Sequence, residues 1–257
     1  MRKSRRVRQL DLNADVGEGD PETDAALLEL VSSANIACGA HAGDAQTMRA
    51  TVASAVRHGV AVGAHPGFND REGFGRRPQH LTADEIRELL QPQLAALDAI
   101  ARAGGTMLHH VKPHGALYNQ AETDGALAAA IVAAVRAFDP TLRLLGRAGS
   151  EMEQVARATG HPFTAEAFAD RGYRSDGTLL PRSEPGALLT DPEEVARQVR
   201  RLVTDGEVFA SDGSRVAVSF GTLCVHGDTP GAARLALRIR QELAALGVSI
   251  SAPANPR

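Results

Sequence analysis

The stretch from Ala34 to Pro66 reads ANIACGAHAGDAQTMRATVASAVRHGVAVGAHP and contains one strand–helix–strand unit. Its apolar runs, Ala34–Cys38 and Val60–Ala64, have the length of buried strands. Between them, Asp44 is placed as the N-cap of a helix and Gly59 as its C-cap. Because a helix between two apolar strands is the repeating unit of α/β folds, this stretch predicts that class.

The same rhythm continues on both sides of this unit. Further strands are expected near Val7–Leu12, Thr106–Lys112, Leu142–Gly146, Pro162–Ala165, just before His226, and at Val248–Ser251. Further helices are expected over Glu22–Val31, from a capping box at Thr82–Glu85 to Ala103, and over Thr123–Ala137, Ser150–Thr159, Asp191–Thr204 and Pro230–Leu246. A Ser-Asp-Gly-Ser turn between Val208–Ala210 and Arg215–Phe220 signals a hairpin. Six or seven such units favour a closed or nearly closed (β/α) barrel, with an open doubly wound sheet as the alternative.

Composition excludes several classes of protein. The chain has 257 residues, 43% of them hydrophobic, and 28 basic against 31 acidic side chains, which indicates a globular protein without a basic field for nucleic acid. Its apolar stretches are far shorter than the roughly 20 residues of a membrane span. We expect a cytoplasmic protein with one domain over residues 1–257, a basic tail at 1–8, and two reduced cysteines. Neither Lys3 nor Lys112 lies in a G-x-x-x-x-G-K-[ST] string, so the sequence has no P-loop.

Polar side chains gather where the expected strands end. Asp11, Asn13 and Asp15 alternate at the end of the first strand, and Glu18 follows them. Histidines follow four other strands, namely His41, His65, His114 and His226. Because barrel enzymes carry their active sites at the C-terminal strand ends, we expect most of these side chains to line one pocket. Turn formation and solvation are the alternative explanation for the first group.

Three kinds of chemistry fit these residue types. Asp15, His41 and His65 are of the types that hold a divalent metal, although no short ligand spacing supports this. The same side chains could act as a metal-free acid and base, or bind a small anion without catalysis. Lys112 could hold an oxyanion or a carboxylate.

Two loops add further charged groups. Arg76 and Arg77, in the string GFGRR, suit a carboxylate or phosphate because a guanidinium donates two parallel hydrogen bonds. Glu166 and Arg171 belong to a polar loop that could close over a pocket or pair charges within itself.

Seven strings carry a family resemblance. They are DLNADVGE (11–18), NIACGAHAGD (35–44), GAHPGFND (63–70), GFGRR (73–77), VKPHGALYN (111–119), EAFADRGY (166–173) and CVHGDTP (224–230). On these strings, the sequence resembles the LamB/YcsF family. The resemblance implies a distorted TIM-like barrel of about seven strands, related to glycoside hydrolase and deacetylase folds. It also implies that the chain opens the lactam of 5-oxo-L-proline to L-glutamate with ATP hydrolysis, together with 5-oxoprolinase subunits B and C.

This reaction suggests a role for each candidate residue. Because the chain has no P-loop, we expect the partner subunits to use ATP as co-substrate, activating the lactam by phosphorylating its amide oxygen, and this chain to hydrolyse the activated species. The expected catalytic residues are Asp15 for water, His65 or His114 as acid, and Lys112 for the oxyanion. The expected substrate-binding residues are Asn13, Glu18, His41, Arg76, Arg77, Glu166, Arg171, His226 and Asp228. The alternatives are a stand-alone metal-dependent deacetylase or amidohydrolase, and a non-catalytic carboxylate-binding protein.

Overall fold

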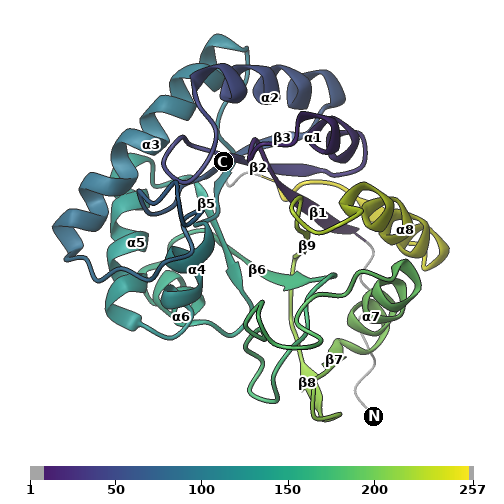
Figure 1. Ribbon diagram of the computed structural model, residues 1–257. Coiled ribbons are helices and arrows are strands. Elements are labelled where there is room, and N and C mark those ends of the chain that lie inside the picture. Colours follow the sequence, from purple (N-terminus) through teal and green to yellow (C-terminus); the bar gives the residue numbers. More distant parts are fainter. Residues whose placement is uncertain (1–8, 255–257) are drawn as a thin grey trace.

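Seven parallel strands close into a barrel in the computed structural model, which describes residues 9–254 (Figure 1). In order around the barrel they are β1 (Gln9–Val16), β2 (Ser33–Ala37), β3 (Ala61–His65), β4 (His110–Val111), β5 (Arg143–Arg147), β6 (Phe163–Phe168) and β9 (Thr222–Val225). Strand β9 pairs with β1 and closes the ring, and β10 (Ser249–Ile250) pairs with the start of β1. The predicted barrel is therefore confirmed, and the open sheet is excluded.

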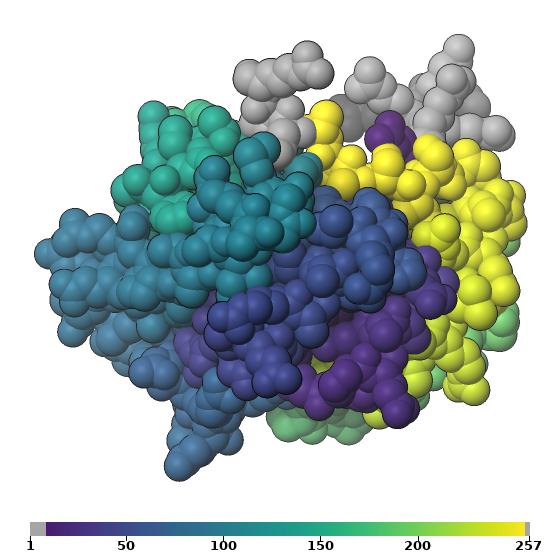
Figure 2. Space-filling view, turned by 90° about the horizontal axis from the view of Figure 1, so that it is seen from above, coloured from purple at the N-terminus to yellow at the C-terminus, as the bar shows by residue number. Residues whose placement is uncertain are grey.

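Helices surround the barrel on its outside, except for the short α4 (Gly115–Ala121), which lies at the mouth of the barrel (Figure 1). They are α1 (Pro21–Leu28), α2 (Ala45–His58), α3 (Ala83–Ala103), α4 (Gly115–Ala121), α5 (Gly125–Phe138), α6 (Glu151–Thr159), α7 (Pro192–Asp205) and α8 (Ala232–Ala245). Helix α8 packs against α1, so the first and last helices of the chain lie side by side, as Figure 2 shows in yellow and purple. No helix within residues 9–254 has both the length and the apolarity that crossing a bilayer requires.

The helix caps predicted from the sequence are present in the structure. The Asp44 side chain accepts the Thr47 N–H, and Gly59 ends α2 with a φ of 67°. Thr82 and Glu85 form a reciprocal capping box at the start of α3. That helix then buries one apolar face, which includes Ile86, Leu90, Leu94 and Leu97.

Some boundaries differ from the sequence prediction. Strand β1 runs to Val16, because its polar residues lie inside the barrel and are bonded there. Strand β4 has only two residues, and the short helix α4 after it was not predicted. The predicted hairpin is present as a separate antiparallel pair, β7 (Glu207–Phe209) and β8 (Arg215–Ala217). The predicted basic tail, residues 1–8, lies outside the described residues.

A polar column fills the barrel beneath its C-terminal mouth. The Asn35 side-chain amide donates to Asp15 Oδ1 at 2.8 Å and to Asn13 Oδ1 at 2.7 Å. His110 Nε2 lies 2.7 Å from Asn35 Oδ1. Its ring occupies the space beside Gly63, where an added Cβ would lie 2.0 Å from Nε2. The missing side chain at Gly63 therefore lets an imidazole enter the barrel and support the residues above it.

Candidate active site

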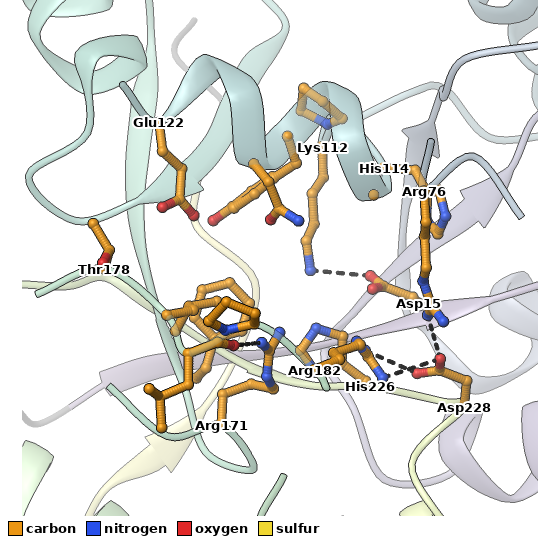
Figure 3. A pocket seen from close by; sticks show the side chains of 18 of the residues that line it. Asp15, Arg76, Lys112, His114, Glu122, Arg171, Thr178, Arg182, His226 and Asp228 are labelled. Carbon is orange, nitrogen blue, oxygen red and sulfur yellow. Dashed lines mark hydrogen bonds and ion pairs between the residues drawn. The ribbon is translucent and has the colours of Figure 1, made fainter. Parts of the chain in front are cut away.

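The main cavity opens at the C-terminal ends of the strands and has a volume of about 560 Å³ (Figure 3). Its lining includes Asp15, Glu18, Arg76, His65, Lys112, His114, Arg171, His226 and Asp228, all of which the sequence had singled out. They come from strand ends and loops that are far apart in the chain. The expected gathering of polar groups at this end of the barrel is present.

An ion pair lies at the floor of the cavity. Lys112 Nζ is 3.0 Å from Asp15 Oδ1 and 3.1 Å from Glu166 Oε1, and all three side chains are buried. Burial alone would raise the pKa of Asp15, but the charges on His65 and Lys112 hold it well below its usual value. Burial would likewise lower the pKa of Lys112, yet Asp15 and the other neighbours raise it well above its usual value. Both groups are therefore charged at neutral pH.

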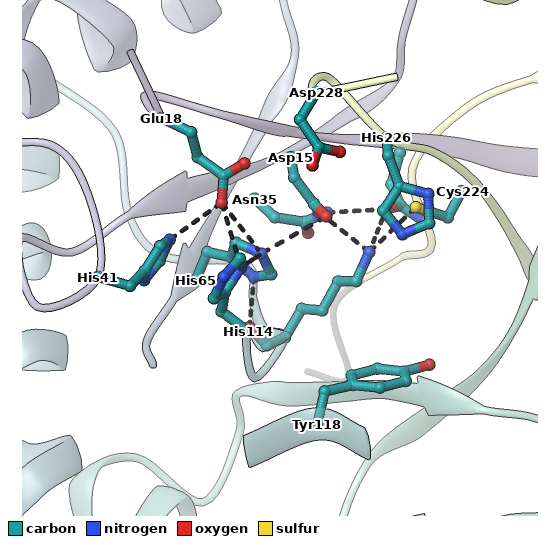
Figure 4. A network of polar contacts seen from close by, with 12 residues as sticks. Asp15, Glu18, Asn35, His41, His65, His114, Tyr118, Cys224, His226 and Asp228 are labelled. Carbon is teal, nitrogen blue, oxygen red and sulfur yellow. Dashed lines mark hydrogen bonds and ion pairs between the residues drawn. The ribbon is translucent and has the colours of Figure 1, made fainter. Parts of the chain in front are cut away.

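A histidine cluster lies beside this ion pair (Figure 4). Glu18 Oε1 lies 2.9 Å from His41 Nε2 and 3.1 Å from His114 Nδ1. His65 Nε2 is 3.0 Å from His114 Nδ1 and 3.5 Å from Asp15 Oδ2. Burial lowers the pKa of His41 to about 4, even though the bond to Glu18 raises it, so this ring is neutral at pH 7. The cluster thus joins four of the predicted residues to the Asp15 carboxylate.

A histidine–aspartate pair, His226 and Asp170, lies on the side of the cavity away from the histidine cluster. His226 Nδ1 is 3.0 Å from Asp170 Oδ1, and the His226 ring stacks on Phe168. Asp170 also accepts the Thr229 hydroxyl at 2.8 Å. Burial would raise the pKa of Asp170, but His226 and Thr229 lower it overall. An ionised carboxylate therefore orients the imidazole through a hydrogen on Nδ1, which leaves Nε2 as the nitrogen not engaged by Asp170.

Arginines form the rim of the cavity. Arg76 pairs with Asp228, and Arg182 NH2 lies 3.1 Å from Asp228 Oδ1. Arg171 is buried and donates to the Leu180 and Ala187 carbonyls. Two guanidinium groups on one partly exposed carboxylate make this rim suited to anions.

Four predicted residues do not line this cavity. Arg77 lies outside it, with a side chain 63% exposed and an ion pair to Asp70 at 3.3 Å. Asn13 and Glu166 lie beneath the floor, where the Asn13 amide donates to Glu166 Oε1 at 2.9 Å. His41 lies behind the cavity wall, where it contacts the Glu18 carboxylate and stacks on the His114 ring.

The structure also regroups the candidate metal residues. His41 and His65 belong to a group with Glu18 and His114, whereas Asp15 belongs to another with Cys224 and His226. The predicted set of Asp15, His41 and His65 thus stays a prediction, and the donor atoms favour a different set.

Sequence reasoning missed several residues of the site. Asn35 had a signal, because it is a polar residue inside an apolar strand. No sequence signal pointed to Arg182 or Glu122. Arg182 lines the cavity because of how the 168–185 loop folds, and Glu122 because it ends α4. Tyr118, whose hydroxyl donates to Glu166 Oε2 at 2.9 Å, also lies on this unpredicted helix.

Comparison with known proteins agrees with this geometry. The model of the LamB/YcsF family matches residues 10–257. The chain belongs to the LamB/YcsF family. A relative from Methylococcus capsulatus, named as the A subunit of 5-oxoprolinase, is 54% identical over 253 residues, which are 96% of each chain. The crystal structure of a lactam utilization protein from Thermus thermophilus is 46% identical with a TM-score of 0.89, covering 95% of this chain and all of that one.

More distant structures share the LamB/YcsF barrel. A family 4 carbohydrate esterase from Streptomyces lividans aligns over 98% of this chain and 95% of its own, with a TM-score of 0.53 and 13% identity. At that identity, the likeness concerns the fold alone. It confirms the deacetylase-like barrel expected from the sequence.

Proposed function

We propose that this chain is the A subunit of a 5-oxoprolinase, which opens the lactam of 5-oxo-L-proline to L-glutamate with ATP hydrolysis. The observation that carries the proposal is the charged Asp15–Lys112 pair at the floor of a cavity with an arginine rim, in a chain 54% identical to a protein of that name. Lactam opening needs a positioned water, a proton donor for the leaving nitrogen, and positive charge near the carbonyl oxygen. The cavity contains groups suited to each of these needs.

The charge and position of Asp15 and His226 suit them to different catalytic roles. The low pKa of Asp15 makes it a weak base, so it is better suited to orient water than to remove its proton. His226 is held by Asp170 with its second nitrogen free, which suits it to take the proton from water and return it to the nitrogen. Water then adds to the carbonyl carbon, and the carbon–nitrogen bond breaks as that proton reaches the nitrogen.

Positive groups surround the expected path of the substrate. Lys112 is the cation nearest the floor, and we assign it the oxygen that becomes negative as water adds. Arg76 and Arg182 lie at the rim, where a carboxylate or phosphate would replace part of their pairing with Asp228. Lys112 and the two arginines thereby place the two ends of a small anionic substrate.

In this proposal, the partner subunits B and C bind and use ATP. The sequence has no P-loop, which supports assigning lactam activation to subunits B and C and hydrolysis of the activated species to this chain. Phosphorylation of the amide oxygen makes the ring carbon a better electrophile. Water adds to that carbon, the carbon–nitrogen bond breaks to leave an acyl phosphate, and a second water releases phosphate and leaves glutamate. A cytoplasmic location stays a prediction.

The test is reconstitution. Glutamate and ADP release dependent on 5-oxoproline are measured with this chain alone, with subunits B and C alone, and with all three. We expect turnover only in the full mixture. Complete ATP-coupled turnover by this chain alone would contradict the division of labour, and no turnover by the full mixture would point to another substrate.

A further inference from the structure

Three donor atoms converge at one point of the cavity wall (Figure 4). His65 Nε2 and His114 Nδ1 are 3.0 Å apart, and Glu18 Oε1 is 3.1 Å from the His114 nitrogen and 3.8 Å from the His65 nitrogen. All three side chains line the cavity, and both histidines are buried.

The outer nitrogens of both rings fix where the hydrogens are. His65 Nδ1 lies 2.7 Å from the Lys112 carbonyl oxygen, and His114 Nε2 lies 2.8 Å from the Phe74 carbonyl oxygen. Because a carbonyl oxygen can only accept, each of these nitrogens carries a hydrogen. With no proton between them, His65 Nε2 and His114 Nδ1 direct their lone pairs at each other and at the Glu18 carboxylate. A cation among the three atoms, either a metal ion or a shared proton, removes that repulsion.

The surroundings hold these donors in place. His41 Nε2 lies 2.9 Å from Glu18 Oε1 and, as a donor, fixes the carboxylate. Phe74 has a φ of 53°, a conformation that side chains other than glycine rarely adopt, and this turn aims its carbonyl at His114. Metal-binding histidines are held in the same way, by a backbone carbonyl or carboxylate on the second ring nitrogen.

We propose that Glu18 Oε1, His65 Nε2 and His114 Nδ1 bind one divalent transition-metal ion, with Zn²⁺ as the best match. Metal–ligand bonds of about 2.0–2.2 Å place the ligand atoms of a tetrahedral site roughly 3.3–3.6 Å apart, and the three observed separations bracket that range. Two imidazoles and one carboxylate suit zinc better than Mg²⁺, which prefers oxygen ligands. Three protein ligands leave a fourth position open toward the cavity.

The neighbouring group of possible ligands, Asp15, Cys224 and His226, does not compete for the ion. Asp15 and Cys224 already share the Lys112 ammonium, at 3.0 and 3.1 Å from Nζ. A fixed positive charge there disfavours a second cation. The site is therefore the histidine cluster.

The catalytic consequence rests on the proposed function, whereas the binding itself does not. An ion at this place would polarise the lactam carbonyl or acidify a bound water. His65 and His114 would then serve as ligands, and proton transfer would fall to His226.

The experiment measures binding by the full chain, without partners or ATP. Protein stripped with a chelator is titrated with Zn²⁺ against a chromophoric zinc indicator, and retained metal is counted by elemental analysis after dialysis. We expect one zinc per chain, a rise in Tm with zinc, and no such effect of Mg²⁺ at equal concentration. Glu18→Gln and His65→Asn should each weaken zinc binding by about 100-fold or more, whereas His80→Asn, a change at an exposed histidine outside the cluster, should not.

Substitution with Co²⁺ provides a readout that needs no variant. Visible absorption bands of a four- or five-coordinate cobalt–imidazole site support the proposal even if a variant fails to fold. Loss of zinc from the wild type on dialysis, or full zinc binding by the Glu18→Gln/His65→Asn double variant, would overturn it. In the first case, a shared proton fills the cluster, and His65 or His114 returns as the acid. Reconstituted 5-oxoprolinase activity is scored separately, so a chain that turns over without zinc refutes this inference and leaves the proposed function intact.

Discussion

Lys112 Nζ lies 3.0 Å from Asp15 Oδ1, and both side chains are buried in the barrel. The same nitrogen is 3.1 Å from Glu166 Oε1, so one ammonium balances two carboxylates. Removing one member of a buried pair leaves a charge that water cannot reach, and this costs more than the pair contributes. Stability and catalysis are therefore linked at this position.

Replacing Lys112 by Met should reduce both the stability and the activity of the protein. We expect kcat and kcat/KM of the reconstituted enzyme to fall together by about 100-fold or more, as after loss of an oxyanion donor. We also expect the free energy of unfolding to fall by about 3–5 kcal/mol, because Asp15 and Glu166 lose their counter-charge. Steady-state kinetics and urea denaturation measure the two effects.

Two further variants separate the stability effect from the catalytic one. Adding Asp15→Asn to Lys112→Met should restore part of the lost stability but none of the activity. Lys112→Arg should not restore kcat, because a planar guanidinium cannot place its donors where the compact ammonium does. A near-wild-type kcat in Lys112→Arg would remove Lys112 from the catalytic residues.

The sequence revealed the barrel and most of the cavity, for a physical reason. Strand ends of a barrel meet at one mouth, so Asp15, His65, Lys112 and His226 could be brought together from their positions alone. Arg76 lines the cavity and Arg77 does not, because adjacent loop positions point in different directions, and substrate binding by Arg77 stays a prediction. The loop contribution of Arg182 depends on tertiary structure, which no local pattern encodes.

His226 should act as a proton carrier that Asp170 orients. Replacing His226 by Asn should lower kcat by about 10²–10⁴-fold, the usual contribution of general acid–base catalysis, and should also lower Tm, because the buried Asp170 carboxylate loses its imidazole partner. Asp170→Asn should lower kcat less, because the amide oxygen still orients the ring but no longer supplies the negative charge that stabilises it as it takes up the proton. Exposed His80, changed to Asn, is the matched control and should keep wild-type kinetics. An unchanged kcat in His226→Asn would assign the proton to the histidine cluster.

Asp24 should make stability depend on pH. Burial raises its pKa from 3.8 to about 6, although the Gly17 N–H bonded to it acts in the opposite direction. The folded state thus holds its proton more tightly than the unfolded chain, so stability falls as pH rises from about 4 to 6. Asp24→Asn should be more stable than the wild type by only about 1–2 kcal/mol at pH 7.5, because solvent screens part of the charge on the partly exposed Asp24, with no difference below pH 4. The Tm of both proteins is measured at pH 7.5 and below pH 4. If Asp24→Asn and the wild type had equal Tm values at pH 7.5, this prediction would be wrong.

Gly63 should tolerate no side chain. An added Cβ would lie 2.0 Å from the buried His110 ring, and this ring is held by Asn35. We expect Gly63→Ala to destabilise the protein by about 3 kcal/mol, the upper part of the range for overpacking. Gly59→Ala meets no atom within 4 Å and should cost only about 1 kcal/mol, through its φ of 67°. In a double-mutant cycle, Gly63→Ala with His110→Ala should be less destabilised than the sum of the single variants.

Arg182 and Arg77 should differ in their effect on substrate binding. Arg182 lines the cavity and lies 3.1 Å from Asp228, whereas Arg77 is mostly exposed and pairs with Asp70 outside the cavity. If the rim holds an anionic group in both the ground state and the transition state, Arg182→Gln should raise KM by about tenfold with little change in kcat. Arg77→Gln removes the same charge from the protein surface and should leave both constants unchanged, which controls for long-range electrostatics. Steady-state kinetics of the three-subunit mixture decide between the two outcomes, because an equal rise in KM in both variants would mean that net charge, and not the rim geometry, attracts the substrate.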